Sequence, residues 1–124
     1  MDAGTILEIL ALLAEYGQTV DQQRWDEHRA LWATDSHLVV FGNDHAGCDT
    51  ITTFMKGSPR GKHLTGIPNI QIHDDRASVR SDFVFFNDQL ALRTAGSYVD
   101  DLVRENGRWC FMRRQIEIQL RAAS

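Results

Sequence analysis

The sequence predicts an α+β domain in which a curved antiparallel sheet wraps over N-terminal helices. Apolar residues recur at three- and four-residue spacing through roughly the first thirty positions, a pattern that indicates amphipathic helices. Later in the chain, long β-branched and aromatic runs alternate with turn-forming residues. Helices that precede a continuous series of strands are typical of an α+β fold. Because no repeat, low-complexity stretch or linker interrupts the chain, we expect a single domain over residues 1–124.

The first helix is predicted to begin at the cap residue Asp2 and to run through Val20. Gly17 lies inside it, and a single internal glycine costs only about 1 kcal/mol. A second helix is expected after Asp21 and should end at Thr34-Asp35-Ser36. Its predicted face carries Trp25, His28, Leu31 and Trp32.

A third, short helix fits Asp49 to Lys56, with Asp49 or Thr50 as its cap and Gly57 and Pro59 as its stop. The strongest hairpin signal is Asn106-Gly107, because these residues accept the positive φ angles of a type I′ turn. The predicted strands are His37 to Phe41, closed by a turn at Gly42-Asn43-Asp44, then Lys62 to His73 with a bulge or edge position at Pro68, then Ala77 to Phe86, Leu90 to Val103 and Trp109 to Leu120. The last four strands are expected to form an antiparallel meander.

Composition narrows the classes of function. The net charge of −4 and the pI near 5.6 argue against a nucleic-acid partner, and no apolar run approaches the roughly 20 residues that span a bilayer. Cys48 and Cys110 belong to no CxxC pair, so zinc is not indicated. The sequence has no Gly-rich phosphate loop and no dinucleotide fingerprint, so we expect no cofactor. With no export signal, a cytoplasmic location is expected.

Five polar residues stand where the pattern predicts apolar side chains, and they are the candidates for chemistry. Tyr16 is either a core tyrosine or a phenol at a pocket mouth that donates to a developing oxyanion. Asp21, at the unfavourable end of the helix dipole, is either a solvated cap or a buried acid that orients a histidine. His63 is either structural or the group that moves a proton near neutral pH.

Asp82 lies among large apolar residues in the middle of a predicted strand, so either its face is solvated or it projects into a polar cavity. Arg114 follows Arg113 in the last strand, and one of the two can reach a carboxylate or a ligand while the other lies at the surface. A metal site made from Asp21, His63 and Asp82 is chemically possible, but no metal-binding spacing such as HxH supports it.

Three segments resemble the SnoaL-like branch of the NTF2-like superfamily, and the similarity covers nearly the whole chain. These are YGQTVDQQRW at residues 16–25, GKHLTG at 61–66 and AGSYVDDLVRENGRWCFMRR at 95–114. The resemblance implies a cystatin-like cone, in which a curved antiparallel sheet surrounds a deep pocket closed by helices. It also implies a homo-oligomer, a trimer or a dimer formed through the sheet.

Asp21 and His63 match an aspartate–histidine pair that removes a proton in three enzymes of this type: scytalone dehydratase, hexachlorocyclohexane dehydrochlorinase and bile-acid 7α-dehydratase. The bile-acid enzyme is also similar at Tyr16, at Asp82 and at a late arginine that corresponds to Arg114 in preference to Arg113. The chain departs from scytalone dehydratase, which has a tyrosine at the position of Val20 and a pocket histidine at the position of Asp82.

The resemblance implies a cofactor-independent lyase that eliminates water, or another β-leaving group, from a small cyclic or polycyclic carbonyl compound. His63 would be the general base, Asp21 would fix the imidazole tautomer and Tyr16 would donate to the developing oxyanion. The expected substrate-binding residues are Asp82, Arg114, Trp25, Trp32, Phe83 and Phe85. An isomerase or polyketide-type cyclase with the same base, and a non-catalytic binding or assembly module, remain open. The expected partner is a small hydrophobic molecule, with no nucleic acid and no membrane.

Overall fold

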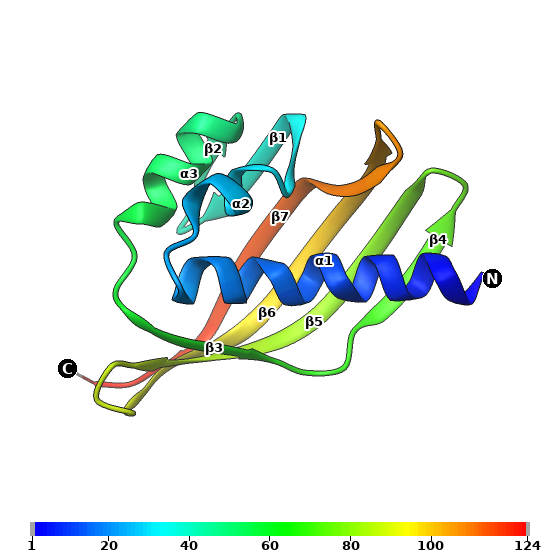
Figure 1. Cartoon of the computed structure of the whole chain (residues 1–124). Helices are drawn as coiled ribbons and strands as arrows, with labels where there is room; N and C mark the ends of the chain where they lie inside the picture. The colour runs from blue at the N-terminus through cyan, green and yellow to red at the C-terminus, as the bar shows by residue number, and fades with distance from the viewer. Residues whose placement is uncertain (1, 124) are drawn as a thin grey trace.

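The computed structural model describes residues 2–123 and contains three helices packed on one sheet (Figure 1). The helices are α1 (Ala3–Asp21), α2 (Trp25–Arg29) and α3 (Cys48–Lys56). The strands are β1 (Trp32–Val40), β2 (Asn43–Ala46), β3 (Gly61–Thr65), β4 (Asn69–His73), β5 (Arg76–Asn87), β6 (Leu92–Glu105) and β7 (Arg108–Arg121).

The strands form one curved sheet in the order β2-β1-β7-β6-β5-β3, and β4 also pairs with β5. Figure 1 shows α1 crossing one face of this sheet, with α2 and α3 near β1. The core lies between α1 and the sheet, where Ile9 and Tyr16 pack in the same cluster as Val79, Leu102 and Phe111. The predicted cystatin-like α+β fold is therefore confirmed. One strand pair departs from the antiparallel prediction, since β1 runs parallel to β7.

The first helix follows its predicted course. The Asp2 carboxylate accepts a hydrogen bond of 2.9 Å from the backbone N–H of Gly4, which caps one of the unpaired donors at the helix start. The helix continues through Gly17 and ends at Asp21. Its last residue is therefore one of the candidate site residues.

The prediction of the second helix is wrong in its second half. In the structure α2 ends at Arg29, and Trp32 begins β1, which continues through the predicted break at residues 34–36. Trp32 is in a strand because it pairs with Phe111 of β7, which is far away along the chain. The register of this pairing then shifts between Trp32 and His37. Within the shifted stretch, the backbone N–H of Thr34 donates to Glu105, which compensates for the irregular ladder.

The turn predicted at residues 42–44 is displaced by one residue. Phe41 and Gly42 have φ angles of 53° and 74°, and they form the two-residue turn between β1 and β2. Similarly, α3 begins at Cys48, so its N-cap residue is Gly47 and not the predicted Asp49 or Thr50. No side-chain hydrogen bond caps this helix at Gly47.

The later strands agree with the sequence prediction to within a few residues. Pro68 separates β3 and β4, so the predicted single run from Lys62 to His73 is two strands, each pairing antiparallel with β5. The hairpin at Asn106-Gly107 is confirmed, with φ angles of 55° and 77°. None of the helices within residues 2–123 is long and apolar enough to cross a bilayer.

Candidate active site

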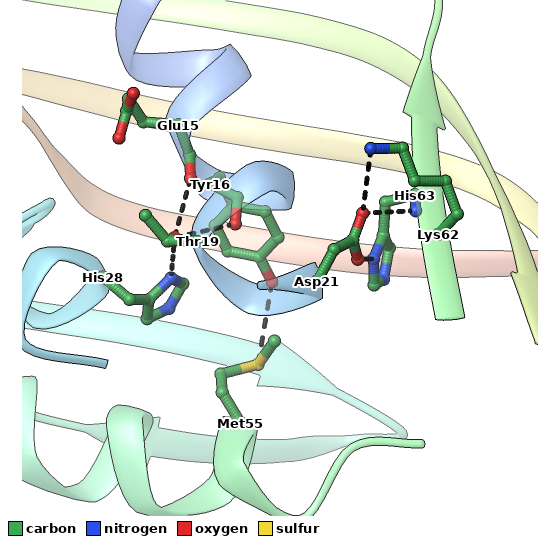
Figure 2. A network of polar contacts seen from close by, with 8 residues as sticks. All are labelled: Glu15, Tyr16, Thr19, Asp21, His28, Met55, Lys62 and His63. Atoms are coloured by element: carbon green, nitrogen blue, oxygen red, sulfur yellow. Dashed lines mark hydrogen bonds and ion pairs between the residues drawn. The ribbon is translucent and has the colours of Figure 1, made fainter. Parts of the chain in front are cut away.

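The carboxylate of Asp21 and the imidazole of His63 are in direct contact. Asp21 is the last residue of α1, and His63 lies in the edge strand β3, 42 positions away along the chain. Asp21 Oδ1 lies 2.6 Å from His63 Nδ1, and Asp21 Oδ2 accepts a 2.9 Å hydrogen bond from the backbone N–H of His63 (Figure 2). The carboxylate therefore holds both the ring and the backbone of the histidine.

A glycine at the start of β3 allows this strand to lie where the contact requires. A Cβ atom at Gly17 would make only an ordinary contact, 3.4 Å from Cβ of His63, so the approach of α1 to β3 does not depend on Gly17. A Cβ at Gly61 would lie 2.0 Å from the carbonyl oxygen of Phe86, so only glycine fits at the start of β3. The aromatic ring of Phe85, cross-strand from His63, then packs 4.7 Å from the imidazole.

The pair is largely withdrawn from water, with 6% of the Asp21 side chain and 14% of the His63 side chain exposed. An ionised carboxylate can only accept hydrogen bonds, so Nδ1 of His63 carries the proton in this contact. In the neutral ring, Nε2 is then an unprotonated base. Lys62 Nζ lies 4.0 Å from Asp21 Oδ2 (Figure 2).

His63 also forms part of the wall of a cavity of about 340 Å³. The wall is mainly aromatic and aliphatic with a few polar groups, a composition typical of small-molecule sites. Its lining residues are Tyr16, Phe41, Phe54, Met55, Gly57, Ser58, Pro59, His63, Phe83, Phe85, Arg93, Thr94, Tyr98, Ile116 and Ile118.

The phenol of Tyr16 lies in the same wall. Its hydroxyl donates to Met55 Sδ at 3.7 Å, a weak interaction with a sulfur acceptor (Figure 2). Burial raises the pKa of Tyr16 to about 12, although the Arg114 guanidinium opposes that shift. The phenol therefore stays protonated at neutral pH, and it can change acceptor when a better one enters the cavity.

Arg114 has a different place from the one expected for a substrate-binding residue. It is fully buried, and its Nε and Nη2 donate to Asp100 at 2.7 and 2.9 Å. Its guanidinium carbon lies 4.2 Å from the Tyr16 ring centre and 3.7 Å from that of Tyr98. Arg114 does not line the cavity, and its guanidinium packs against the rings of the two tyrosines. Burial opposes its charge, but Asp100 raises the pKa of Arg114 above its ordinary value.

The expectation that Asp82 projects into the cavity is wrong. Asp82 is exposed, and it accepts a 2.8 Å hydrogen bond from the hydroxyl of Ser97. Successive side chains of a strand point to opposite faces, and Phe83 occupies the cavity face at the next position. Asp82 therefore does not join Asp21 and His63 in a three-residue cluster.

Of the four aromatic residues expected in the wall, two line the cavity and two do not. Phe83 and Phe85 lie on its surface, as expected. Trp32 is buried behind Tyr16, and its ring N–H donates to Nε2 of His28 at 3.1 Å. Trp25 packs against the ring of His28, also outside the cavity.

Sequence reasoning missed four polar residues of the wall, Ser58, Arg93, Thr94 and Tyr98, of which Tyr98 and Arg93 bear most on its chemistry. Tyr98 lies on the cavity face of β6. In the segment SYVDDL, every second residue (Tyr98, Asp100 and Leu102) lies on the same face of the strand, and this alternation could have identified Tyr98. Burial raises the pKa of Tyr98 well above its ordinary value, so it also stays protonated. Arg93 reaches the cavity through an irregularity in β6 that has no sequence signal.

Comparison with known proteins agrees with this architecture. The profile of the SnoaL-like domain matches residues 2–115. No curated protein matches the chain at a significant level.

Three solved structures illustrate the range of proteins with this fold. A protein of unknown function with a cystatin-like fold from Nostoc punctiforme is 24% identical, with a TM-score of 0.89 and coverage of 96% of this chain and 94% of that one. A protein provisionally assigned as a scytalone dehydratase from Novosphingobium aromaticivorans is 20% identical, with a TM-score of 0.80 and coverage of 94% and 85%. The β subunit of a protein provisionally assigned as an aromatic-ring-hydroxylating dioxygenase, also from Novosphingobium aromaticivorans, is 20% identical, with a TM-score of 0.75 and coverage of 98% and 95%. At these identities the likeness establishes the fold alone.

Proposed function

This chain belongs to the SnoaL-like domain family, and from that premise we propose that it is a cofactor-independent lyase. The proposed reaction is elimination of water, or of another β-leaving group, from a small cyclic or polycyclic carbonyl compound. The observation that carries the proposal is the 2.6 Å contact between Asp21 Oδ1 and His63 Nδ1 at the wall of an apolar cavity.

The proposed chemistry begins with proton removal by Nε2 of His63. This atom takes a proton from the carbon next to the carbonyl group, and the C–H electron pair moves toward the carbonyl oxygen to give an enolate. The enolate then re-forms the carbonyl group as the new C=C bond develops and the β-hydroxyl departs. The imidazolium proton passes to the departing oxygen, so water leaves and His63 is restored. Asp21 holds the ring and stabilises the transient imidazolium.

Tyr16 and Tyr98 are the donors placed to stabilise the enolate oxygen. Both phenols lie in the cavity wall, their ring centres are 5.6 Å apart, and burial keeps both protonated. The weak bond from Tyr16 to Met55 Sδ costs little to exchange for a bond to a charged oxygen. Donors fixed in a water-poor site are worth more than the same donors in water.

The test uses a panel of cyclic β-hydroxy ketones, with loss of water followed by product mass spectrometry. His63→Ala and Asp21→Asn are each expected to reduce turnover by about 100-fold or more, because the first removes the base and the second removes the carboxylate that orients it. His73→Ala, at an exposed histidine at the end of β4, is the matched control and should keep wild-type turnover. Circular dichroism checks that all variants are folded.

The same panel separates the alternatives. A product of unchanged mass would favour an isomerase or a cyclase that uses the same base. Unchanged turnover in both dyad variants would remove the catalytic proposal altogether. The absence of turnover in the wild type across the panel would favour a binding or assembly module, a role compatible with the likeness to a dioxygenase subunit.

A further inference from the structure

A β-bulge in β6 directs an arginine to the cavity. Phe85 pairs with Thr94, and the next residue of β5, Phe86, pairs with Leu92. Arg93 is therefore an extra residue in the ladder, and it lines the cavity together with its neighbour Thr94. Bulges of this kind re-aim side chains and are frequent beside functional sites.

The guanidinium of Arg93 has no carboxylate partner among residues 2–123. Among these residues, the guanidinium makes a single hydrogen bond, a long one of 3.5 Å from Nη1 to the carbonyl oxygen of Ala123. The residues that line the cavity include no aspartate or glutamate, although the whole chain has a net charge of −4. A half-buried cation that has no counter-ion within the described part of the chain, at the side of an apolar cavity, is well suited to bind an anion.

The sheet also fixes how far the backbone of Arg93 lies from the backbone of His63, the proposed base. His63 of β3 pairs with Phe85 of β5, which pairs with Thr94 of β6, the residue next to Arg93. Two strand spacings separate their backbones by roughly 10 Å. A rigid cyclic compound can therefore place an acidic carbon at His63 and a charged substituent at Arg93.

We propose that Arg93 binds a carboxylate of the substrate, so that the cavity selects cyclic carbonyl compounds that carry an acidic group at the opposite end from the reacting carbon. A single guanidinium with one backbone carbonyl beside it suits a singly charged carboxylate better than a phosphate, which would require more donors. This inference narrows the substrate class of the proposed lyase. It depends on the proposed lyase function only for the carbonyl group and the acidic carbon at His63, and not for the carboxylate at Arg93.

Calorimetric titration with 2-naphthoate and its neutral analogue 2-naphthamide tests this preference without any need for turnover. The two compounds have the same ring system and differ in charge at one group. The wild type is expected to bind 2-naphthoate roughly 5- to 20-fold more tightly, and Arg93→Gln should remove that difference. Arg93→Lys, which keeps the charge and loses the fork-shaped donor set, should keep part of it.

Arg80→Gln is the matched control, because it changes the net charge equally at an exposed position of β5 outside the cavity wall. It should leave the preference intact. The proposal is overturned if the wild type binds both compounds equally or binds neither, or if Arg80→Gln reduces the preference as much as Arg93→Gln. A preference that survives Arg93→Gln and disappears in His63→Ala would assign the anion to the imidazole and also overturn it.

Failure of this proposal is distinguishable from failure of the lyase proposal. The naphthoate preference is a binding measurement that does not require an active dyad. Loss of turnover in His63→Ala and Asp21→Asn, combined with equal affinity for the two naphthyl compounds, would leave the lyase standing and remove the carboxylate.

Discussion

At the scale of single residues, His28 shows how a histidine can be fully buried without chemistry of its own. Its Nε2 accepts from the Trp32 ring N–H, so Nδ1 carries the proton and donates to Thr19 Oγ1 at 2.9 Å. The Thr19 hydroxyl in turn donates to the carbonyl oxygen of Glu15 at 2.7 Å (Figure 2). Every polar atom of the ring is satisfied in the neutral form.

This arrangement predicts a loss of stability in acid. Burial, with the nearby Arg114 cation adding to it, lowers the pKa of His28 to about 4. The unfolded chain takes up the proton below about pH 6.5 and the folded chain does not, so acidification favours unfolding between about pH 6.5 and pH 4. Urea titrations should give a free energy of unfolding lower by about 2 kcal/mol at pH 5 than at pH 7 from this residue.

His28→Gln isolates the contribution of His28 from that of other titrating groups. The variant is expected to be less stable at neutral pH, because it disturbs a buried network. Its stability should nevertheless depend less on pH than that of the wild type over the same interval. An identical pH dependence in the two proteins would contradict the assigned role of His28.

At the scale of elements, β3 positions His63, the proposed base, and the position of β3 depends on Gly61. Any larger residue there would bring Cβ to 2.0 Å from the carbonyl oxygen of Phe86 and 2.5 Å from the Phe85 ring. Because β3 is an edge strand paired with β5 alone, it can move away from β5 to relieve this contact. Such a movement would also separate His63 from Asp21.

Gly61→Ala is therefore expected to lower the free energy of unfolding by roughly 1–3 kcal/mol and to reduce turnover together with it. The measurements are urea denaturation and the elimination assay on the same preparation. Gly66→Ala is the control, because a Cβ at Gly66 would make only an ordinary contact, 3.9 Å from the carbonyl oxygen of Asp82. Equal effects of the two substitutions would show that steric crowding at Gly61 is not the cause.

Local signals allowed some elements to be predicted, and non-local pairing displaced others. Asn106-Gly107 specifies its turn through its own backbone preferences, so the hairpin was predicted correctly. Trp32 was placed on a helix because its pairing with Phe111 joins segments far apart in the sequence. The bulge at Arg93 likewise depends on registers that no local pattern specifies.

The candidate site residues, like the elements of the fold, could be predicted only in part from the sequence. The resemblance singled out Asp21 and His63, which the structure brings into contact, but periodicity alone could not show that they meet. Alternation placed Asp82 and Phe83 on opposite faces, and the sequence did not specify which face borders the cavity. Arg114 was recognised as unusual, but its partner Asp100 was identified only by the fold.

At the scale of the whole molecule, a buried ion pair connects the sheet to the first helix. Arg114 of β7 and Asp100 of β6 are both about 1% exposed, and the guanidinium contacts the ring of Tyr16 from α1. Removing one member of such a pair leaves an uncompensated charge in the core. The Nη1 atom of Arg114 already has no hydrogen-bond partner among the described residues.

Asp100→Asn is expected to lower the free energy of unfolding by about 3–5 kcal/mol, as urea denaturation would measure. The double variant Asp100→Leu with Arg114→Met removes both charges and should recover a large part of that loss, because apolar replacements avoid the desolvation cost. A double variant less stable than Asp100→Asn would contradict this account. The expected homo-oligomer also belongs to this scale and stays a prediction that sedimentation velocity can test.

The separation of Asp21 and His63 along the chain has a consequence for how activity is gained and lost. Asp21 and His63 meet only when the opening helix has docked on a strand that is made about forty residues later, so no fragment that lacks either segment contains the pair. Under the proposed lyase function, activity therefore requires α1 docked on β3, and heat inactivation should occur no later than global melting.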